Sequence, residues 1–206
     1  MQIDHIVYAV PDFEAAIEQL EKIVGIRPTF GGYHAFKGTK NVLVNLGNQC
    51  YLEILAVDET NLNIKPPRWM GVDLITEPKI TRWSLKSVDW KQESKVLKSY
   101  HAEMGIMKDG KRETADGDLL TWRMLMPLAN PAVELVPFFT DWQTSSIHPT
   151  DNLLEKCQLM DITFTHPTPE LVQATFDKLN LNYTIQKGES SKIEITIDTP
   201  NGRVVI

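Results

Sequence analysis

The sequence contains little cysteine: Cys50 and Cys157 are the only two in 206 residues. They are far apart and each lies in a strand-like stretch, so we expect reduced core thiols, not a disulfide framework or a Cys-X-X-Cys metal site. No apolar run approaches the roughly 18 residues that a membrane helix needs. The opening stretch MQIDHIVYAV also lacks the basic and long apolar segments of a signal peptide. We therefore expect a cytoplasmic protein with no membrane partner.

The sequence also lacks a concentration of basic residues. The formal net charge is −6, and Lys and Arg are scattered along the chain, which argues against a nucleic-acid partner. None of the motifs G-x-S-x-G, G-x-x-x-x-G-K-[ST], H-E-x-x-H or G-x-G-x-x-G occurs, so the hydrolase-triad, nucleotide triphosphatase, zincin and Rossmann interpretations fall away. What remains is a globular chain long enough to bury a sizeable core.

Three segments repeat the order strand, helix, glycine. The first, IDHIVYAVPDFEAAIEQLEKIVGI, has a strand of about eight residues, a helix start at Asp12 and a stop at Gly25. The same order appears in residues 80–106 with Asp89 at the helix start. It appears again in residues 158–181, where Thr168 starts the helix. We therefore expect helices that begin near residues 12, 89 and 168.

Each predicted helix is followed by signals for three short strands, with Asp116-Gly117 as a hairpin turn in the second segment. The pattern predicts an α+β fold of repeated βαβββ units. The expected strands are 27–34, 41–46 and 50–57, then 107–114, 119–126 and 132–139, then 182–187, 192–198 and 203–206. The expected organisation is a first unit at 1–57, a connection at 58–79, a second unit at 80–139, a connection at 140–156 and a third unit at 157–206.

A βαβββ unit leaves one sheet face uncovered, so two units must meet, usually as a half-open barrel or cup. A pair of βαβββ units of which the first begins with DHIVYAV resembles the vicinal oxygen chelate superfamily. That superfamily includes glyoxalase I, extradiol dioxygenases and antibiotic-resistance proteins. More narrowly, GGYHAFKGTKN, YLEILAVD, RETADGDLLTW and VPFFTDW are similar to its glyoxalase-like domain family, over nearly the whole chain. The third unit has Asp161 at its first-strand position, and we expect it to be a structural partner.

The resemblance implies a divalent metal in the cup, held from the first and fourth strands of each unit. The implied ligands are His5 and Glu53 in the first unit and Glu134 in the second. Arg82 stands where a second histidine is expected, and a guanidinium cannot ligate a metal. Three ligands are enough for Zn, Mn, Ni or Fe. In the alternative, Arg82 pairs with Glu134 or Glu53 and no metal binds.

The stretch GGYHAFKGTKN is either a polar connection or the rim of a binding site. His34, Thr39 and Asn41 fall on positions that match the family pattern, so the resemblance implies that His34 orients a substrate or acts on it. Without the resemblance, His34 is more simply a turn residue. Thr39 and Asn41 offer short donors and acceptors for a ligand, and Gly31 permits a close backbone approach.

Several further side chains are candidates for contact with a ligand. Trp83, Trp122 and Trp142 lie in strands or at strand ends, where aromatics are more often core than ligand contacts. Arg112 can hold an anionic substrate if it points into the cup, whereas Asp116 is a turn former. The remaining histidines are expected to be structural or exposed: His101, His148 and His166.

Two functions of different classes stay open. In the first, the cup is a glyoxalase-like enzyme, with lyase, isomerase or dioxygenase-type chemistry assisted by a divalent metal, and with Glu134 as third ligand or general base. In the second, it is a metal-free protein that binds or sequesters a small molecule, with Arg82 in place of a ligand. The cup can form within one chain or across a homodimer. The fold does not decide between these functions.

Overall fold

The computed structural model describes residues 1–61, 63–113, 117, 119–142, 145, 147–154 and 156–206. The predicted turn former Asp116 lies outside these residues. Within them, no helix is long and apolar enough to cross a membrane.

The three α-helices begin where the sequence predicts. The carboxylate of Asp12 accepts a hydrogen bond from the Ala15 amide, and that of Asp89 accepts one from the Gln92 amide, so each satisfies a free donor of the first turn. The third helix starts with a proline, whose missing N–H costs nothing in the first turn. The helices are α1 (Phe13–Val24), α2 (Trp90–Tyr100) and α3 (Pro169–Lys178), with the 3₁₀ segments η1 (Trp69–Leu74) and η2 (Ala102–Gly105).

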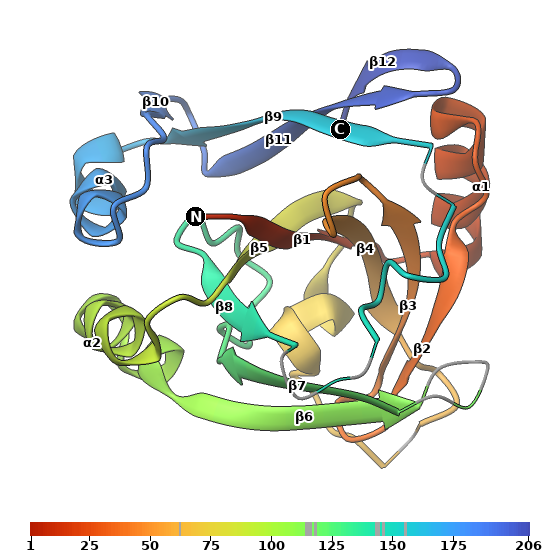
Figure 1. Ribbon diagram of the computed structural model, residues 1–206, viewed down its shortest axis with the longest axis horizontal. Coiled ribbons are helices and arrows are strands. Elements are labelled where there is room, and N and C mark those ends of the chain that lie inside the picture. Colours follow the sequence, from red (N-terminus) through yellow and green to blue (C-terminus); the bar gives the residue numbers. More distant parts are fainter. Residues whose placement is uncertain (62, 114–116, 118, 143–144, 146, 155) are drawn as a thin grey trace.

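The first two predicted units form one eight-stranded sheet with the order β2-β3-β4-β1-β5-β8-β7-β6. In each half the first strand runs parallel to the last, β1 with β4 and β5 with β8, and the halves join through the antiparallel pair β1–β5. The sheet curves into a single cup within one chain (Figure 1). The strands are β1 (Ile3–Ala9), β2 (Thr29–His34), β3 (Thr39–Asn45), β4 (Tyr51–Val57), β5 (Lys79–Lys86), β6 (Met107–Glu113), β7 (Leu119–Leu125) and β8 (Phe138–Asp141).

The central strands are buried on both faces, which explains why β1 and β4 read as nearly continuous apolar runs. On the outer face, Ile6 and Leu52 belong to the main core, beneath the helices. On the inner face, Val7, Leu55 and Phe138 form a smaller cluster with residues of η1. This inner cluster closes part of the cup's interior and leaves room for a cavity beside it.

The third predicted unit forms a separate four-stranded sheet whose pairing differs from that of the first two. Its order is β10-β9-β11-β12, so the first strand lies inside the sheet, parallel to the second and antiparallel to the third. The three units therefore share an order of elements but not a topology. This sheet lies as a layer along β1 and β5, on the side opposite β6 and β7 (Figure 1). Its strands are β9 (Gln158–His166), β10 (Ile185–Lys187), β11 (Lys192–Thr199) and β12 (Gly202–Val205).

One predicted strand is largely wrong. The sequence suggested a strand at 132–139, whereas β8 begins only at Phe138. Pro131 and Pro137 lack the N–H that a central strand must donate, so the segment between them is a loop. Glu134 therefore lies before the strand rather than in it. The domain boundaries drawn from the sequence stay a prediction.

We expect replacement of Trp83 by Ala to destabilise the fold by about 3–5 kcal/mol, the usual cost of truncating a fully buried Trp. Trp83 is 0% exposed, donates its indole N–H to the Leu135 carbonyl at 2.6 Å and packs on Phe164 of the third unit's sheet. The matched variant Trp122→Ala, in the wall of the cup, should cost less. Urea unfolding compares the two, and equal losses would contradict the division between core and cup.

Candidate active site

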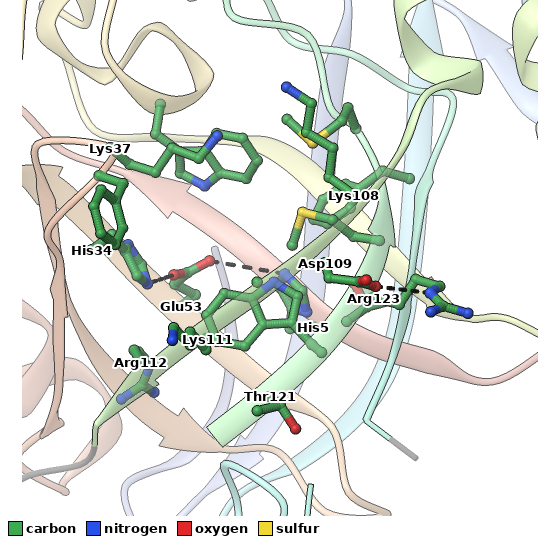
Figure 2. A pocket seen from close by; sticks show the side chains of 18 of the residues that line it. His5, His34, Lys37, Glu53, Lys108, Asp109, Lys111, Arg112, Thr121 and Arg123 are labelled. Atoms are coloured by element: carbon green, nitrogen blue, oxygen red, sulfur yellow. Dashed lines mark hydrogen bonds and ion pairs between the residues drawn. The ribbon is translucent and has the colours of Figure 1, made fainter. Parts of the chain in front are cut away.

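The cup contains a cavity of about 720 Å³ that both halves of the sheet line. Its size is in the range of sites for small organic ligands. Figure 2 shows the polar side chains gathered in it, with His5, His34 and Glu53 close together. Of the residues singled out in the sequence, those that line it are His5, His34, Asn41, Glu53, Arg112, Trp122 and Trp142.

A buried Asp–His pair lies at one side of the cavity. The Nδ1 atom of His5 is 2.5 Å from Oδ1 of Asp4, which is fully buried. The pairing of β1 with β5 shifts its register between Ile3 and His5. Such an irregularity changes the direction in which side chains point, and here it accompanies the contact between the neighbouring residues Asp4 and His5. Tyr51 stacks on the His5 ring and Phe138 meets it edge-on, which fixes its plane. Nε2 is left facing the cavity.

Asp4 is ionised, and this sets the hydrogen position on His5. Burial alone would raise the pKa of Asp4, but its interactions with the imidazoles of His148, at 3.7 Å, and His5, at 2.5 Å, outweigh burial and lower the pKa to about 2. An ionised carboxylate only accepts hydrogen bonds, so Nδ1 of His5 must carry the hydrogen. With its hydrogen on Nδ1, the neutral form of the ring has its lone pair at Nε2, as a general base requires.

Glu53 of β4 lies at the centre of the polar group. Its Oε1 accepts a hydrogen bond of 2.6 Å from Nδ2 of Asn41. Its Oε2 is 3.9 Å from Nε2 of His5, and Oε1 is 3.9 Å from Nε2 of His34. Glu53 is 5% exposed. The carboxylate is therefore held by one amide, with two imidazoles at a distance that leaves space for a ligand atom.

His34 is part of the rim and not only a turn residue. Its Nδ1 lies 2.9 Å from Oγ1 of Thr39, which does not itself line the cavity but orients the ring. Burial lowers the pKa of His34, partly offset by Glu53, and Arg112, His5 and Lys37 lower it further, to about 4. The ring is therefore neutral near pH 7. The turn closes by bonds from the Lys37 and Gly38 amides to the His34 carbonyl.

Arg112 fastens the two sides of the cup to each other. From β6 its guanidinium donates to the Gly31 carbonyl of β2. A Cβ at Gly31 would approach Oδ1 of Asn41 to 2.4 Å, so glycine at this position leaves room for the Asn41 amide. Arg112 lines the cavity, and its guanidinium also has a structural partner.

Two of the three predicted tryptophans form the apolar wall. The rings of Trp122 and Trp142 are 5.3 Å apart, and Trp122 covers Gly110 of the neighbouring strand, where a Cβ would meet the indole at 2.4 Å. The Trp142 indole N–H donates to Oδ2 of Asp4 at 2.9 Å. The wall and the Asp4–His5 pair are thus one connected unit.

Trp83, Arg82 and Glu134 do not line the cavity. Trp83 faces the outer core. The guanidinium of Arg82 is buried and donates to the carbonyls of Thr81, Leu128, Asn130 and Ala132. Glu134 accepts from the Tyr100 hydroxyl and the Val136 amide, each at 3.0 Å.

The sequence therefore misplaced Arg82 and Glu134 as site residues, and strand register is the physical reason. His5 pairs with Tyr51 of β4, and the corresponding pair in the second half is Ser84 with Phe138. Ser84 also lies directly opposite His5 across the two halves. Counting back from the helix caps places Arg82 opposite His5, two residues before Ser84. The count does not take account of the irregular register between β1 and β5.

The residues present do not fit the superfamily's four-ligand metal site. By register, the counterparts of His5 and Glu53 are Ser84 and Thr140, whose hydroxyl oxygens are 2.8 Å apart and bonded to each other. Neutral hydroxyls are weak replacements for imidazole and carboxylate ligands. Among the described residues, no group of three or more His, Cys, Asp or Glu side chains is arranged to hold a metal ion. The implied ligand set His5, Glu53 and Glu134 does not come together.

Sequence reasoning missed Asp4, His148, Lys37 and Lys108. Asp4 was detectable, because a carboxylate inside an apolar strand needs a partner. His148 was expected to be structural or exposed, yet its Nε2 is buried 3.7 Å from Oδ2 of Asp4. Lys37 and Lys108 carry no local signal, because lysines in a turn and a strand are ordinary surface residues. His101 and His166 do have the structural roles expected, since each accepts a hydrogen bond from a nearby amide.

We expect Asp4→Asn to remove about 2 kcal/mol of stability near neutral pH, together with its pH dependence. The pKa of Asp4 falls from 3.8 to about 2 on folding, and about 1.4 kcal/mol corresponds to each unit. Because the folded-state pKa is the lower one, this stability is present above the unfolded-state pKa and is lost as pH falls through the folded-state value. Urea unfolding of both proteins from about pH 6 towards pH 3 measures the loss. If the free energy of unfolding depended on pH in the variant as it does in the wild type, this expectation would be contradicted.

The curved eight-stranded sheet with its two βαβββ halves is the fold of the vicinal oxygen chelate superfamily. The chain belongs to the glyoxalase-like domain family, whose model matches residues 3–180. No curated protein matches the sequence significantly.

Solved structures share this fold at low sequence identity. A hypothetical protein from Staphylococcus aureus has a TM-score of 0.67 at 18% identity, covering 93% of this chain and 88% of that one. A mutant of 4-hydroxymandelate synthase from Streptomyces coelicolor has a TM-score of 0.54 at 13% identity, covering 99% of this chain and 62% of that one. Methylmalonyl-CoA epimerase from Mycobacterium tuberculosis, at a TM-score of 0.40 and 14% identity, covers 68% of this chain and 85% of that one. The likenesses to the Staphylococcus aureus protein and the synthase concern the fold alone.

Proposed function

We propose that the protein is an enzyme that moves a proton on a small carbonyl compound bound in the cup, as isomerases and lyases do. The observation that carries the proposal is the Asp4–His5 pair, in which an ionised, buried carboxylate holds the imidazole so that Nε2 faces the cavity and Glu53. A general base must lie within reach of the proton that it removes, and its orientation must be fixed.

The proposed step uses His5 as the base. Its Nε2 removes a proton from the carbon beside the carbonyl, the C–H electron pair forms an enolate, and Asp4 stabilises the resulting imidazolium. Return of the same proton to another atom completes an isomerisation without any co-reactant. Glu53, 3.9 Å away, holds a substrate hydroxyl or serves as the second proton carrier.

His34 stabilises the charge that develops on the carbonyl oxygen. When the Thr39 hydroxyl donates to Nδ1, Nε2 carries the hydrogen and can donate to that oxygen. With a pKa of about 4, His34 is neutral near pH 7 and polarises the oxygen without giving up a full proton. The roles of His5, His34 and Glu53 need no metal.

The test is solvent exchange in heavy water. Carbonyl compounds with an acidic C–H bond, both neutral and anionic, are incubated with the chelator-treated protein, and proton NMR follows the loss of the C–H signal. Enzyme-dependent exchange in one of these compounds is the expected result. Binding with no exchange would support the second candidate, a sequestering protein. The apolar side chains of the cavity, which include Trp69, Trp122, Met124 and Met126, are the observation that favours that candidate.

A further inference from the structure

The cavity has a charge opposite to that of the whole protein. Among the residues that the structure describes, five cationic and two acidic ones line it, in a chain whose formal net charge is −6. Of these cations, Arg123 is paired with Asp109 at 2.8 Å and Arg112 donates to the Gly31 carbonyl. The cationic side chains are Lys37, Lys108, Lys111, Arg112 and Arg123.

Two of the lysines belong to opposite sides of the cavity and have no acidic partner among the side chains that the structure describes. Lys37 lies in the turn between β2 and β3, and Lys108 lies on β6. Figure 2 shows both at the same end of the cavity, away from Arg112. Lys40 of the same hairpin differs from Lys37, because it is paired with Glu59 at 2.7 Å.

The side chain of Lys37 is held in place in spite of its unpaired charge. Its Nζ lies 4.2 Å from the centre of the Trp69 ring, a cation–π contact. The bonds from the Lys37 and Gly38 amides to the His34 carbonyl fix the turn. Burial lowers the pKa of Lys37, and the charge of Lys108 lowers it further, so the two ammonium groups repel each other. An anion between them would remove that repulsion.

We propose that Lys37 and Lys108 bind the anionic group of an amphipathic organic ligand, a carboxylate or a phosphate, while its apolar part lies against the tryptophan wall. This inference rests on the proposed function, because it names the class of carbonyl compound that the acid–base centre receives. The ligand extends from the lysines to the polar group at His5 and Glu53, in a cavity that is also lined by apolar side chains, among them Trp69, Trp122 and Met126.

The test compares two fluorescent dyes that differ in charge: anilinonaphthalene sulfonate, an aromatic anion, and its neutral parent phenylnaphthylamine. We expect Lys37→Gln/Lys108→Gln to weaken binding of the anion by about tenfold or more and to leave the neutral dye unchanged. The matched control Lys91→Gln/Lys95→Gln makes the same charge change on the exposed side of α2 and should leave both affinities unchanged. Inorganic phosphate should displace the anion from the wild type and not from the cavity variant.

Anion affinity that is equal in the cavity variant and the wild type would overturn the inference, as would an equal loss in the control variant. Its failure is separable from that of the proposed function. Deuterium exchange that depends on His5, with no effect of the lysines on the anion, would overturn only the lysine site. A lysine-dependent anion site with no exchange in any carbonyl compound would overturn only the proton transfer.

Discussion

Replacing His5 by Gln should lower the rate of solvent exchange into a bound carbonyl compound by about 10²- to 10⁴-fold, the usual contribution of a positioned general base. Gln has a similar reach and keeps a hydrogen-bonding group beside Asp4, but it cannot take up a proton. Nε2 of His5 faces the cavity, with Asp4 behind the ring at 2.5 Å. Proton NMR in heavy water measures the rate.

Two further variants separate the roles within this group. His34→Gln should lower the exchange rate less than His5→Gln, because His34 only donates to the developing oxyanion. Affinity for the anionic dye should be unchanged in His5→Gln, since the lysines lie at another part of the cavity. An exchange rate that is the same in His5→Gln and the wild type would remove His5 from the mechanism.

Installing histidine at Ser84 and glutamate at Thr140 should raise the affinity for Zn, Mn or Ni by about 10²- to 10⁴-fold, because two weak hydroxyl groups become two strong ligands. The register puts Ser84 directly opposite His5, and Thr140 lines the same cavity. His5 is already oriented through Nδ1 by Asp4, as metal-binding histidines commonly are.

The matched control for the metal experiment is Arg82→His. Arg82 points to the loop carbonyls and not into the cavity, so this variant should gain no affinity and should lose stability. Titration calorimetry measures all three proteins. A gain in Arg82→His, with none in the double variant, would show that the register assigned to the second half is wrong.

Signals within short stretches of sequence predicted the helices and the strand pairing within the first unit. Apolar periodicity and the caps at Asp12 and Asp89 placed the helices. The parallel pairing of β1 with β4 follows from a βαβββ unit, and it brings Glu53 beside His5. The resemblance to the family added His34. These side chains come together because the fourth strand of each unit returns next to the first.

The second half of the site could not be predicted in the same way. Its register depends on irregular pairing between β1 and β5 and on the prolines before Phe138, and neither leaves a simple pattern in one sequence. The different pairing in the third unit's sheet is a contact between distant segments, which a matching order of elements does not determine. Lys37 and Lys108 are brought to one cavity only by the closure of β6 towards β2.

The most direct test of the account is the rate of deuterium incorporation by chelator-treated wild-type protein, measured by proton NMR beside His5→Gln on the same carbonyl compound. If His5 is the base and no metal takes part, exchange persists in the wild type without added metal and falls by about 10²-fold or more in the variant. Exchange that stops with the chelator and returns with a divalent metal, or that is equal in the two proteins, would contradict it.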